Sequence, residues 1–214
     1  MNEEKELISL FPTPLVKANI GRSFTKEELE CITNIPMTRE GERGRWKKIE
    51  GAGGQSESYD IFNKFEELKD LKTFCEGELK VYLEDIEGVN TDITNLNITT
   101  SWLNKIEPQD CHTLHNHRNS YLSGVLYIHC LPDDNIQFTN RHLMFNQSLQ
   151  LPIKKTTQFN AASAAVKIKE GDFIIFPSLV LHQVGMNETK DKERLSLSFD
   201  TWPTYLPSLY PPYK

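Results

Sequence analysis

The sequence has no apolar run that approaches the roughly 20 residues of a membrane-spanning helix. Its first residues, MNEEKELISL, are acidic and lack the basic and then apolar pattern of a secretory signal peptide. Cysteine is scarce, and Cys31, Cys75, Cys111 and Cys130 show no CxxC spacing, which is typical of reduced thiols inside cells. We therefore expect a soluble, cytoplasmic protein without disulfides.

An excess of positive charge is also missing. The 214 residues include 24 Lys and Arg against 30 Asp and Glu, a formal net charge of -6 at pH 7. A protein whose main task is binding nucleic acid phosphates would show a basic stripe. The one local basic cluster, Arg39–Lys48, is interleaved with glutamates, which is typical of a solvated loop. The composition thus disfavours nucleic acid and membranes as partners.

Helical patterns occur in the first 91 residues. Thr25 and Glu28 have the spacing of a capping box, before a helix that Pro36 ends. From 61 to 84, apolar residues recur at spacings of three, four and seven, which predicts one long amphipathic helix with Asp60 as its cap.

Two further segments of this half are predicted to be extended or irregular. Residues 7–20 alternate loosely and contain two prolines, as an edge strand does. The stretch Thr38–Ser58 is rich in Gly, Arg and Glu, and we interpret it as a mobile surface loop. Long loops near a barrel mouth are often lids over a substrate, and the role of this one stays open.

After Asp92 the pattern changes to short alternating runs separated by turn signals. The predicted strands are 94–106, 120–131, 135–139, 164–169, 172–177, 180–186 and 193–201. Helices followed by short strands predict an α+β fold with antiparallel sheets, and about eight such strands fit a jelly roll, or double-stranded β-helix. We expect a single domain over 1–214, in which residues 1–91 support a jelly-roll core at 92–214.

Alternation along two of these strands separates a polar from an apolar face. Tyr121, Ser123, Val125 and Tyr127 share one face, opposite Leu122, Leu126 and Ile128. Arg194, Ser196, Ser198 and Asp200 likewise oppose Leu195, Leu197 and Phe199. We expect the apolar faces to pack against helices and the polar faces to line a barrel mouth.

Histidines are concentrated in Cys111–Leu131, which holds four of the six. His115 and His117 are two residues apart, so in an extended backbone both imidazoles leave one face and suit a divalent metal. A third ligand must come from elsewhere, and His182, at the end of an apolar run, is the candidate. We interpret His112, His129 and His142 as surface or hydrogen-bonded core residues.

Six motifs follow one another in an informative order. They are Leu10–Pro14 (LFPTP), Trp102–Asn104 (WLN), His115–His117 (HNH), Ser123–Tyr127 (SGVLY), Gly171–His182 (GDFIIFPSLVLH) and Arg194–Phe199 (RLSLSF). This set resembles the 2-oxoglutarate- and Fe(II)-dependent dioxygenase superfamily, and in particular a prolyl-hydroxylase-like branch from phages and bacteria. If a phage encodes the chain, its location would be the host cytoplasm. The specificity lies in the ordered set, because each motif alone is weak.

The resemblance implies an Fe(II) site, but one ligand departs from the usual pattern. These dioxygenases present two histidines and one carboxylate, with HxD on the first ligand strand, and this chain has His117 in place of the Asp. Either His117 binds the metal in a three-histidine site, or water takes that position, or Asp133 or Asp134 supplies a carboxylate. A further alternative shifts the motif by two residues, so that His117 is the first ligand and Asn119 stands in the Asp position. We favour His115, His117 and His182.

The resemblance also implies a site for 2-oxoglutarate. Its 1-carboxylate and keto oxygen would chelate the iron, and its 5-carboxylate would lie on the guanidinium fork of Arg194 and the hydroxyl of Ser196. Tyr127 falls where related hydroxylases place a tyrosine on the same carboxylate. No catalytic residue beyond the metal ligands is expected. Trp102 and Asn104 lie on the same face of the predicted strand 94–106. We interpret Trp102 as a core residue, whereas Asn104 could belong either to the core or to the pocket.

The function predicted in this way is an oxygenase. It would convert 2-oxoglutarate to succinate and CO2 while it hydroxylates a C–H bond of an unidentified peptide or metabolite. Two other classes remain: a three-histidine zinc hydrolase, and a jelly-roll binding or structural module whose histidines have no metal.

Overall fold

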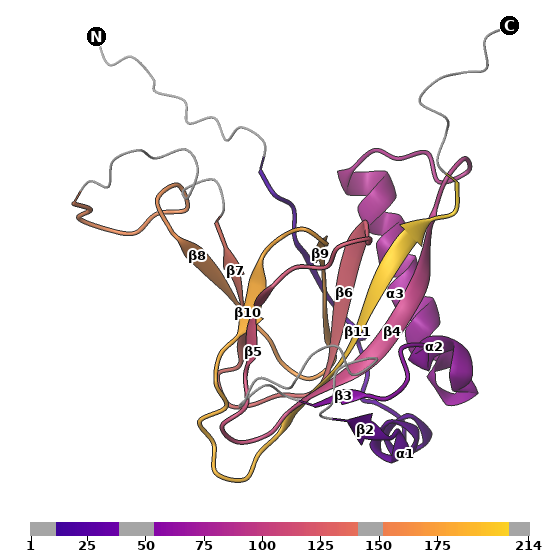
Figure 1. The fold of residues 1–214 in the computed structure, drawn as a ribbon. Coiled ribbons are helices and arrows are strands. Elements are labelled where there is room, and N and C mark those ends of the chain that lie inside the picture. Colours follow the sequence, from indigo (N-terminus) through magenta and orange to yellow (C-terminus); the bar gives the residue numbers. More distant parts are fainter. Residues whose placement is uncertain (1–11, 39–53, 141–151, 206–214) are drawn as a thin grey trace, which may run out of the picture.

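Two antiparallel sheets form the body of the protein. The computed structural model describes residues 12–38, 54–140 and 152–205. The larger sheet has the order β1 (Val16–Asn19), β9 (Asp172–Pro177), β6 (Leu122–His129), β11 (Arg194–Pro203), β4 (Leu96–Ile106), β3 (Gly54–Ser56) and β2 (Met37–Thr38). The smaller sheet has the order β5 (His112–His115), β10 (His182–Val184), β7 (Asn135–Thr139) and β8 (Ser163–Lys167). The sheets lie opposite each other (Figure 1), which confirms the predicted antiparallel jelly roll.

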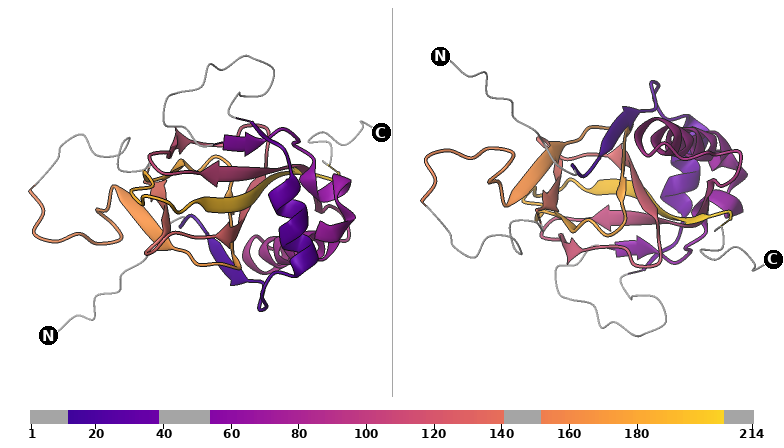
Figure 2. Two further views of the ribbon diagram at one scale, coloured as in Figure 1. Left: turned by 90° about the horizontal axis from the view of Figure 1, so that it is seen from below. Right: turned by 90° about the horizontal axis from the view of Figure 1, so that it is seen from above.

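Helices cover the outer face of the larger sheet, as Figure 2 shows from two sides. The core cluster on this face joins the helix α3 (Lys69–Val81) to the apolar residues of β6 and β11. Its members include Leu71, Cys75, Leu79, Leu122, Leu126, Leu197 and Phe199, each at most 1% exposed. A second cluster between the two sheets includes Tyr127, Ile136, Phe138, Ile174 and Phe176. The predicted division of β6 and β11 into a helix-facing and an interior face is therefore confirmed.

The capping box forms as predicted at the start of α1 (Lys26–Asn34). The Glu28 backbone N–H donates to Thr25 Oγ1 over 3.1 Å, and the Thr25 N–H donates to the Glu28 carboxylate over 2.8 Å. These bonds satisfy backbone donors that the first turn of a helix leaves without partners. The helix ends at Asn34, two residues before Pro36.

The single long helix predicted over 61–84 is wrong. The segment divides into α2 (Ile61–Lys64), a 3₁₀ turn η2 (Glu66–Leu68), α3 and a π turn η3 (Tyr82–Ile86). Phe65 is extended, with φ -119 and ψ 106, and Asp60 makes no side-chain capping bond. The Phe62 N–H donates to Ser101 Oγ of β4 over 2.9 Å, so a tertiary contact holds the first turn of α2 at the sheet before the chain turns at Phe65. Periodicity does not report such a bond.

Residues before 92 contribute strands as well as helices. β1 pairs with β9 at one edge of the larger sheet, in agreement with the edge strand predicted within 7–20. β2 and β3 pair with each other at the opposite edge, so the predicted loop Thr38–Ser58 begins and ends in paired strands. The rest of that loop, the basic cluster Arg39–Lys48, the start of the LFPTP motif and His142 lie outside the described residues.

The structure also bears on the cysteines and on possible membrane-spanning segments. All four cysteines are free thiols, as predicted. None of the helices in the described ranges has the length and hydropathy of a membrane-spanning segment.

A close contact between β6 and β11 gives a test of this core. A Cβ atom at Gly124 would lie 2.3 Å from Cζ of Phe199, whereas one at Gly77, on the exposed side of α3, would have no neighbour within 4 Å. We expect Gly124→Ala to lower the free energy of unfolding by about 1–3 kcal/mol because the core is overpacked. Gly77→Ala should raise it by up to about 1 kcal/mol because alanine favours the helix. Urea denaturation measures both, and equal stability of the two variants would contradict this packing.

Candidate metal centre

Three histidines converge between the two sheets. The potential ligand atoms of His115, His117 and His182 all lie within 4.8 Å of one another. His115 ends β5, and His182 begins β10 directly opposite it in the register of the two strands. His117 lies in the loop after β5, where its N–H donates to the Ser178 carbonyl over 2.8 Å. The predicted trio is thus together, although a loop and not the strand itself positions His117.

Hydrogen bonds assign the same tautomer to all three rings. His115 Nδ1 lies 2.7 Å from the Thr113 carbonyl, and His182 Nδ1 lies 3.0 Å from the Val180 carbonyl. His117 Nδ1 lies 2.8 Å from Asp200 Oδ1. Carbonyl and carboxylate oxygens only accept, so each Nδ1 carries the hydrogen, and each neutral ring keeps its lone pair on Nε2. Three imidazole lone pairs at one point are a donor set for a divalent metal ion.

Burial keeps the rings of His115 and His182 neutral. Burial, together with the neighbouring His115, lowers the pKa of His182 to about 3. Burial also lowers the pKa of His115 below its ordinary value of 6.5. Neutral imidazole is the form that binds metals, so the site is prepared for a cation at neutral pH.

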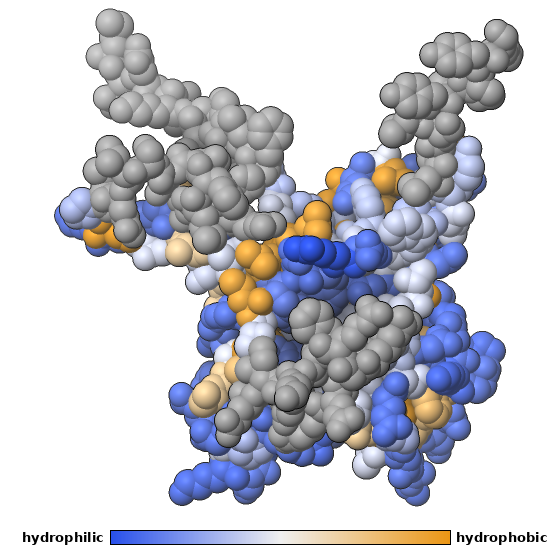
Figure 3. Space-filling view, in the orientation of Figure 1, coloured by the Kyte–Doolittle hydropathy of each residue, from blue (hydrophilic) through white to orange (hydrophobic). Residues whose placement is uncertain are grey.

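Aromatic side chains enclose the trio on two sides. The indole of Trp102 stacks on His117 with ring centroids 5.6 Å apart, and Phe176 meets His182 edge to face at 4.7 Å. Trp102 is 7% exposed and donates to Asn104 Oδ1 over 3.1 Å, so it serves as core and as a wall of the site at once. Figure 3 shows a mostly hydrophilic face whose centre is recessed, with apolar side chains along one border of the recess.

The guanidinium of Arg194 is buried and has a protein partner. Arg194 is 3% exposed, and its Nε donates to Asp134 Oδ2 over 2.6 Å. Its Nη2 also contacts Asp134 and donates to the Asn135 carbonyl over 3.2 Å. Asp134 therefore occupies the edge of the fork that we expected to be free for a ligand. Only Nη1 remains.

Two buried donors are left without partners beside one another. Among buried side-chain nitrogen and oxygen atoms of the described residues, only Arg194 Nη1 and the Tyr127 hydroxyl lack a hydrogen bond. Burial raises the pKa of Tyr127, so this hydroxyl stays protonated and can donate. Tyr127 lies opposite Ser196 in the register of β6 and β11, two residues from Arg194. An unsatisfied buried polar group costs about 1–3 kcal/mol, and an anionic ligand would relieve both.

The other residues weighed as ligands lie outside the trio. Asp134 is engaged with Arg194, and the side chain of Asp133 is 93% exposed. Asn119 is exposed, with a positive φ of 64. His129 is exposed, whereas the ring of His112 lies 6.0 Å from that of His115. Burial lowers the pKa of His112 to about 4, so it is a neutral neighbour of the trio.

Sequence reasoning missed two carboxylates that matter here. The sequence analysis assigned Asp200 to the polar face of its strand but gave it no role. In the structure, its carboxylate accepts a hydrogen bond from His117. Asp134 was weighed as a metal ligand, and it binds Arg194 instead. Asp200 lies on the same face of the predicted strand as Arg194, and this could have indicated that its side chain lies near the site. No signal in the sequence pairs Asp134 with a residue 60 positions away.

Residues 100–200 match the model of a family described as "Putative 2OG-Fe(II) oxygenase". No curated protein matches the chain in sequence.

Solved structures share the fold at low identity. A Pseudomonas putida prolyl-4-hydroxylase is 14% identical with a TM-score of 0.54, over 88% of this chain and 92% of that one. The epimerase SnoN, in complex with Fe3+, alpha ketoglutarate (2-oxoglutarate) and nogalamycin RO, is 14% identical with a TM-score of 0.60, over 94% and 89%. A prolyl hydroxylase from Trichoplax adhaerens, in complex with a hypoxia inducible factor peptide fragment, is 12% identical with a TM-score of 0.58, over 88% and 83%.

The depressed pKa of His182 predicts how the metal-free protein responds to acid. Its folded-state pKa is about 3 and its ordinary value 6.5, so below pH 6.5 the unfolded chain binds more protons. Stability is therefore lost as the pH falls, by about 2 kcal/mol from this residue between pH 6.5 and pH 5. Urea unfolding at both pH values, in the presence of a chelator, measures the loss. His182→Gln should reduce it and exposed His129→Gln should not; an unchanged pH dependence in His182→Gln would contradict the assignment.

Proposed function

We infer that this chain belongs to the 2-oxoglutarate- and Fe(II)-dependent oxygenase superfamily, which the family match over residues 100–200 supports, and that it holds Fe(II) through His115, His117 and His182. Arg194, Tyr127 and Ser196 form the site for the far carboxylate of 2-oxoglutarate. The reaction is hydroxylation of a C–H bond of a second substrate, with release of succinate and CO2.

The donor set fits the metal. Three neutral imidazoles leave further coordination positions open, as a catalytic metal requires. Because none of the three carries a charge, the ion keeps its full positive charge, which favours direct binding of an anionic co-substrate. When bound, the iron and 2-oxoglutarate together supply the oxidising chemistry that activates O2, and the protein supplies position and environment.

The hydrogen-bond donors of Arg194 and Tyr127 suit the far carboxylate of the co-substrate. Nη1 of Arg194 and the hydroxyl of Tyr127 are buried donors that a carboxylate would satisfy with charge-assisted hydrogen bonds. Asp134 holds the guanidinium by its other edge, so Nη1 is fixed in direction before the ligand arrives. Ser196, 6% exposed and opposite Tyr127, is placed to add a third hydrogen bond.

The single observation that carries this proposal is that the described residues hold both a three-imidazole cluster and a pair of buried donors without hydrogen-bond partners. A zinc hydrolase would need the histidines but has no task for Arg194 and Tyr127. A binding module without a metal would explain neither the common tautomer of the rings nor the unsatisfied donors.

The second substrate is proposed only by chemical class, as a peptide or a small metabolite. Two of the similar structures contain such molecules, a peptide fragment in one and nogalamycin RO in the other. We also propose that the chain acts as one domain, which is supported by a larger sheet built from strands on both sides of residue 92. A cytoplasmic location stays a prediction.

Removal of one imidazole tests the metal site. Under anaerobic conditions, Fe(II) and 2-oxoglutarate should give the wild-type protein a visible metal-to-ligand charge-transfer band and a higher melting temperature, because both bind only the folded state. His182→Ala should lose the band and the thermal shift. His129→Ala, a histidine outside the cluster, is the control and should keep both. A wild-type protein with neither signal would contradict the proposed function.

Tyrosine variants test the co-substrate pocket. Tyr127→Phe removes a buried hydroxyl that has no partner among the described residues, so the free protein should be as stable as the wild type or more stable. Its affinity for 2-oxoglutarate should fall about 10-fold or more, since a hydrogen bond to a charged group is worth about 1.5–3 kcal/mol.

The matched control is Tyr82, whose hydroxyl donates to the Pro14 carbonyl over 3.2 Å. Tyr82→Phe should lose about 1 kcal/mol of stability and leave co-substrate affinity unchanged. Titration of the charge-transfer band and urea denaturation give the two quantities. Equal 2-oxoglutarate affinity in Tyr127→Phe and the wild type would remove Tyr127 from the pocket.

A further inference from the structure

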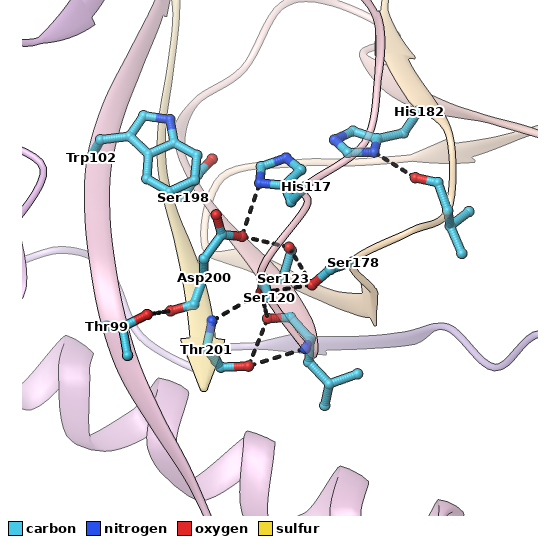
Figure 4. A network of polar contacts seen from close by, with 12 residues as sticks. Thr99, Trp102, His117, Ser120, Ser123, Ser178, His182, Ser198, Asp200 and Thr201 are labelled. Carbon is cyan, nitrogen blue, oxygen red and sulfur yellow. Dashed lines mark hydrogen bonds and ion pairs between the residues drawn. The ribbon is translucent and has the colours of Figure 1, made fainter. Parts of the chain in front are cut away.

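We propose that Asp200 is a positioning residue of the metal centre, which orients His117 and supplies negative charge that the three imidazoles lack. This inference rests on the proposed function. Asp200 is the acceptor of the His117 Nδ1 hydrogen, with Oδ1 at 2.8 Å (Figure 4). The side chains are 12% exposed for His117 and 19% for Asp200, so water screens this contact only weakly.

His117 differs from the other two imidazoles in what holds it. His115 and His182 lie in paired strands, and their Nδ1 hydrogens go to carbonyls two residues away in the same chain segment. His117 lies in a loop, and its partner comes from β11, 83 positions further along the sequence (200 − 117). Its ring direction therefore depends on a tertiary contact.

Asp200 is itself held by hydrogen bonds. Ser123 Oγ donates to Asp200 Oδ1 over 2.6 Å and lies 2.8 Å from Ser178 Oγ. Ser178 Oγ donates in turn to Ser120 Oγ over 2.7 Å, and Ser120 Oγ accepts the Thr201 N–H over 3.1 Å. Figure 4 shows this chain of hydroxyls beneath the carboxylate. A carboxylate fixed in this way holds its partner to one direction.

The two faces of His117 complete the arrangement. Trp102 stacks on the ring at an interplanar angle of 24°, and His182 stacks on it at 18°. Stacking fixes the plane of the ring but not its rotation within that plane. The bond from Nδ1 to Asp200 fixes that rotation, so that Nε2 faces the other two ligand atoms.

The position of the charge has an electronic consequence. A carboxylate that accepts the hydrogen of a ligating imidazole makes that imidazole a stronger donor to the metal. His115 and His182 have neutral carbonyls in the same position. Asp200 would thus supply one negative charge on the side of the His117 ring opposite its metal-binding nitrogen, without being a ligand itself.

Two substitutions separate orientation from charge. Asp200→Ala removes the acceptor and the charge, and it should weaken Co(II) or Fe(II) binding by about 10- to 100-fold. Asp200→Asn can still accept the Nδ1 hydrogen through its amide oxygen, so it should recover part of that affinity. With less electron density at the iron, its Fe(II)–2-oxoglutarate charge-transfer band should move to shorter wavelength. Asp133→Asn makes the same chemical change at a side chain that is 93% exposed, and should alter neither quantity.

The outcomes distinguish this inference from the proposed function. If the wild-type protein binds no metal, the proposed function fails. If it binds metal, and both Asp200 variants match its affinity and band position, Asp200 has no part in the centre and the inference is overturned. If Asp200→Ala does not fold, the band position of Asp200→Asn still decides, since a purely structural role would leave that band where it is.

Discussion

The central place of β11 in the larger sheet is the constraint on which the rest of the structure depends. β11 pairs with β4 on one side and β6 on the other, so its backbone direction is fixed along most of its length. Side chains alternate between the faces of a strand. Leu197 and Phe199 are thereby buried under the helices, while Arg194, Ser196 and Asp200 face the other sheet. A shift of one residue in this register would exchange the two sets, and the core and the site would be lost together.

Hydrogen bonds and charges in the interior of the barrel are not arranged for stability alone. The pair formed by Arg194 and Asp134 is buried, and such a pair is at best weakly stabilising once the loss of hydration is counted. Beside it, Nη1 of Arg194 and the hydroxyl of Tyr127 carry the cost of burial without compensation. Buried polar groups without partners are usual at functional sites, where the geometry needed for binding lowers the stability of the free protein.

Local patterns predicted much of the fold. The capping box at Thr25, the seven strand segments after residue 92 and the two faces of β6 and β11 follow from side-chain chemistry and periodicity, and the structure confirms them. The single helix over 61–84 was wrong because the backbone of Phe65 is extended between α2 and η2, and such a local break leaves no trace in the spacing of apolar residues. The trio His115, His117 and His182 was selected from residue type and order, and the structure brings it together.

Residue identity and the twofold repeat of a strand were enough to predict the candidate site residues and the strand faces that they occupy. The hydrogen-bond and ion-pair partners of these residues could be read from the tertiary structure alone. Asp134 neutralises Arg194, and Asp200 accepts from His117, although each pair is separated by 60 or more positions. The physical reason is that hydrogen bonds and ion pairs act over a few ångströms, so their partners are set by how the sheets close and not by distance along the chain.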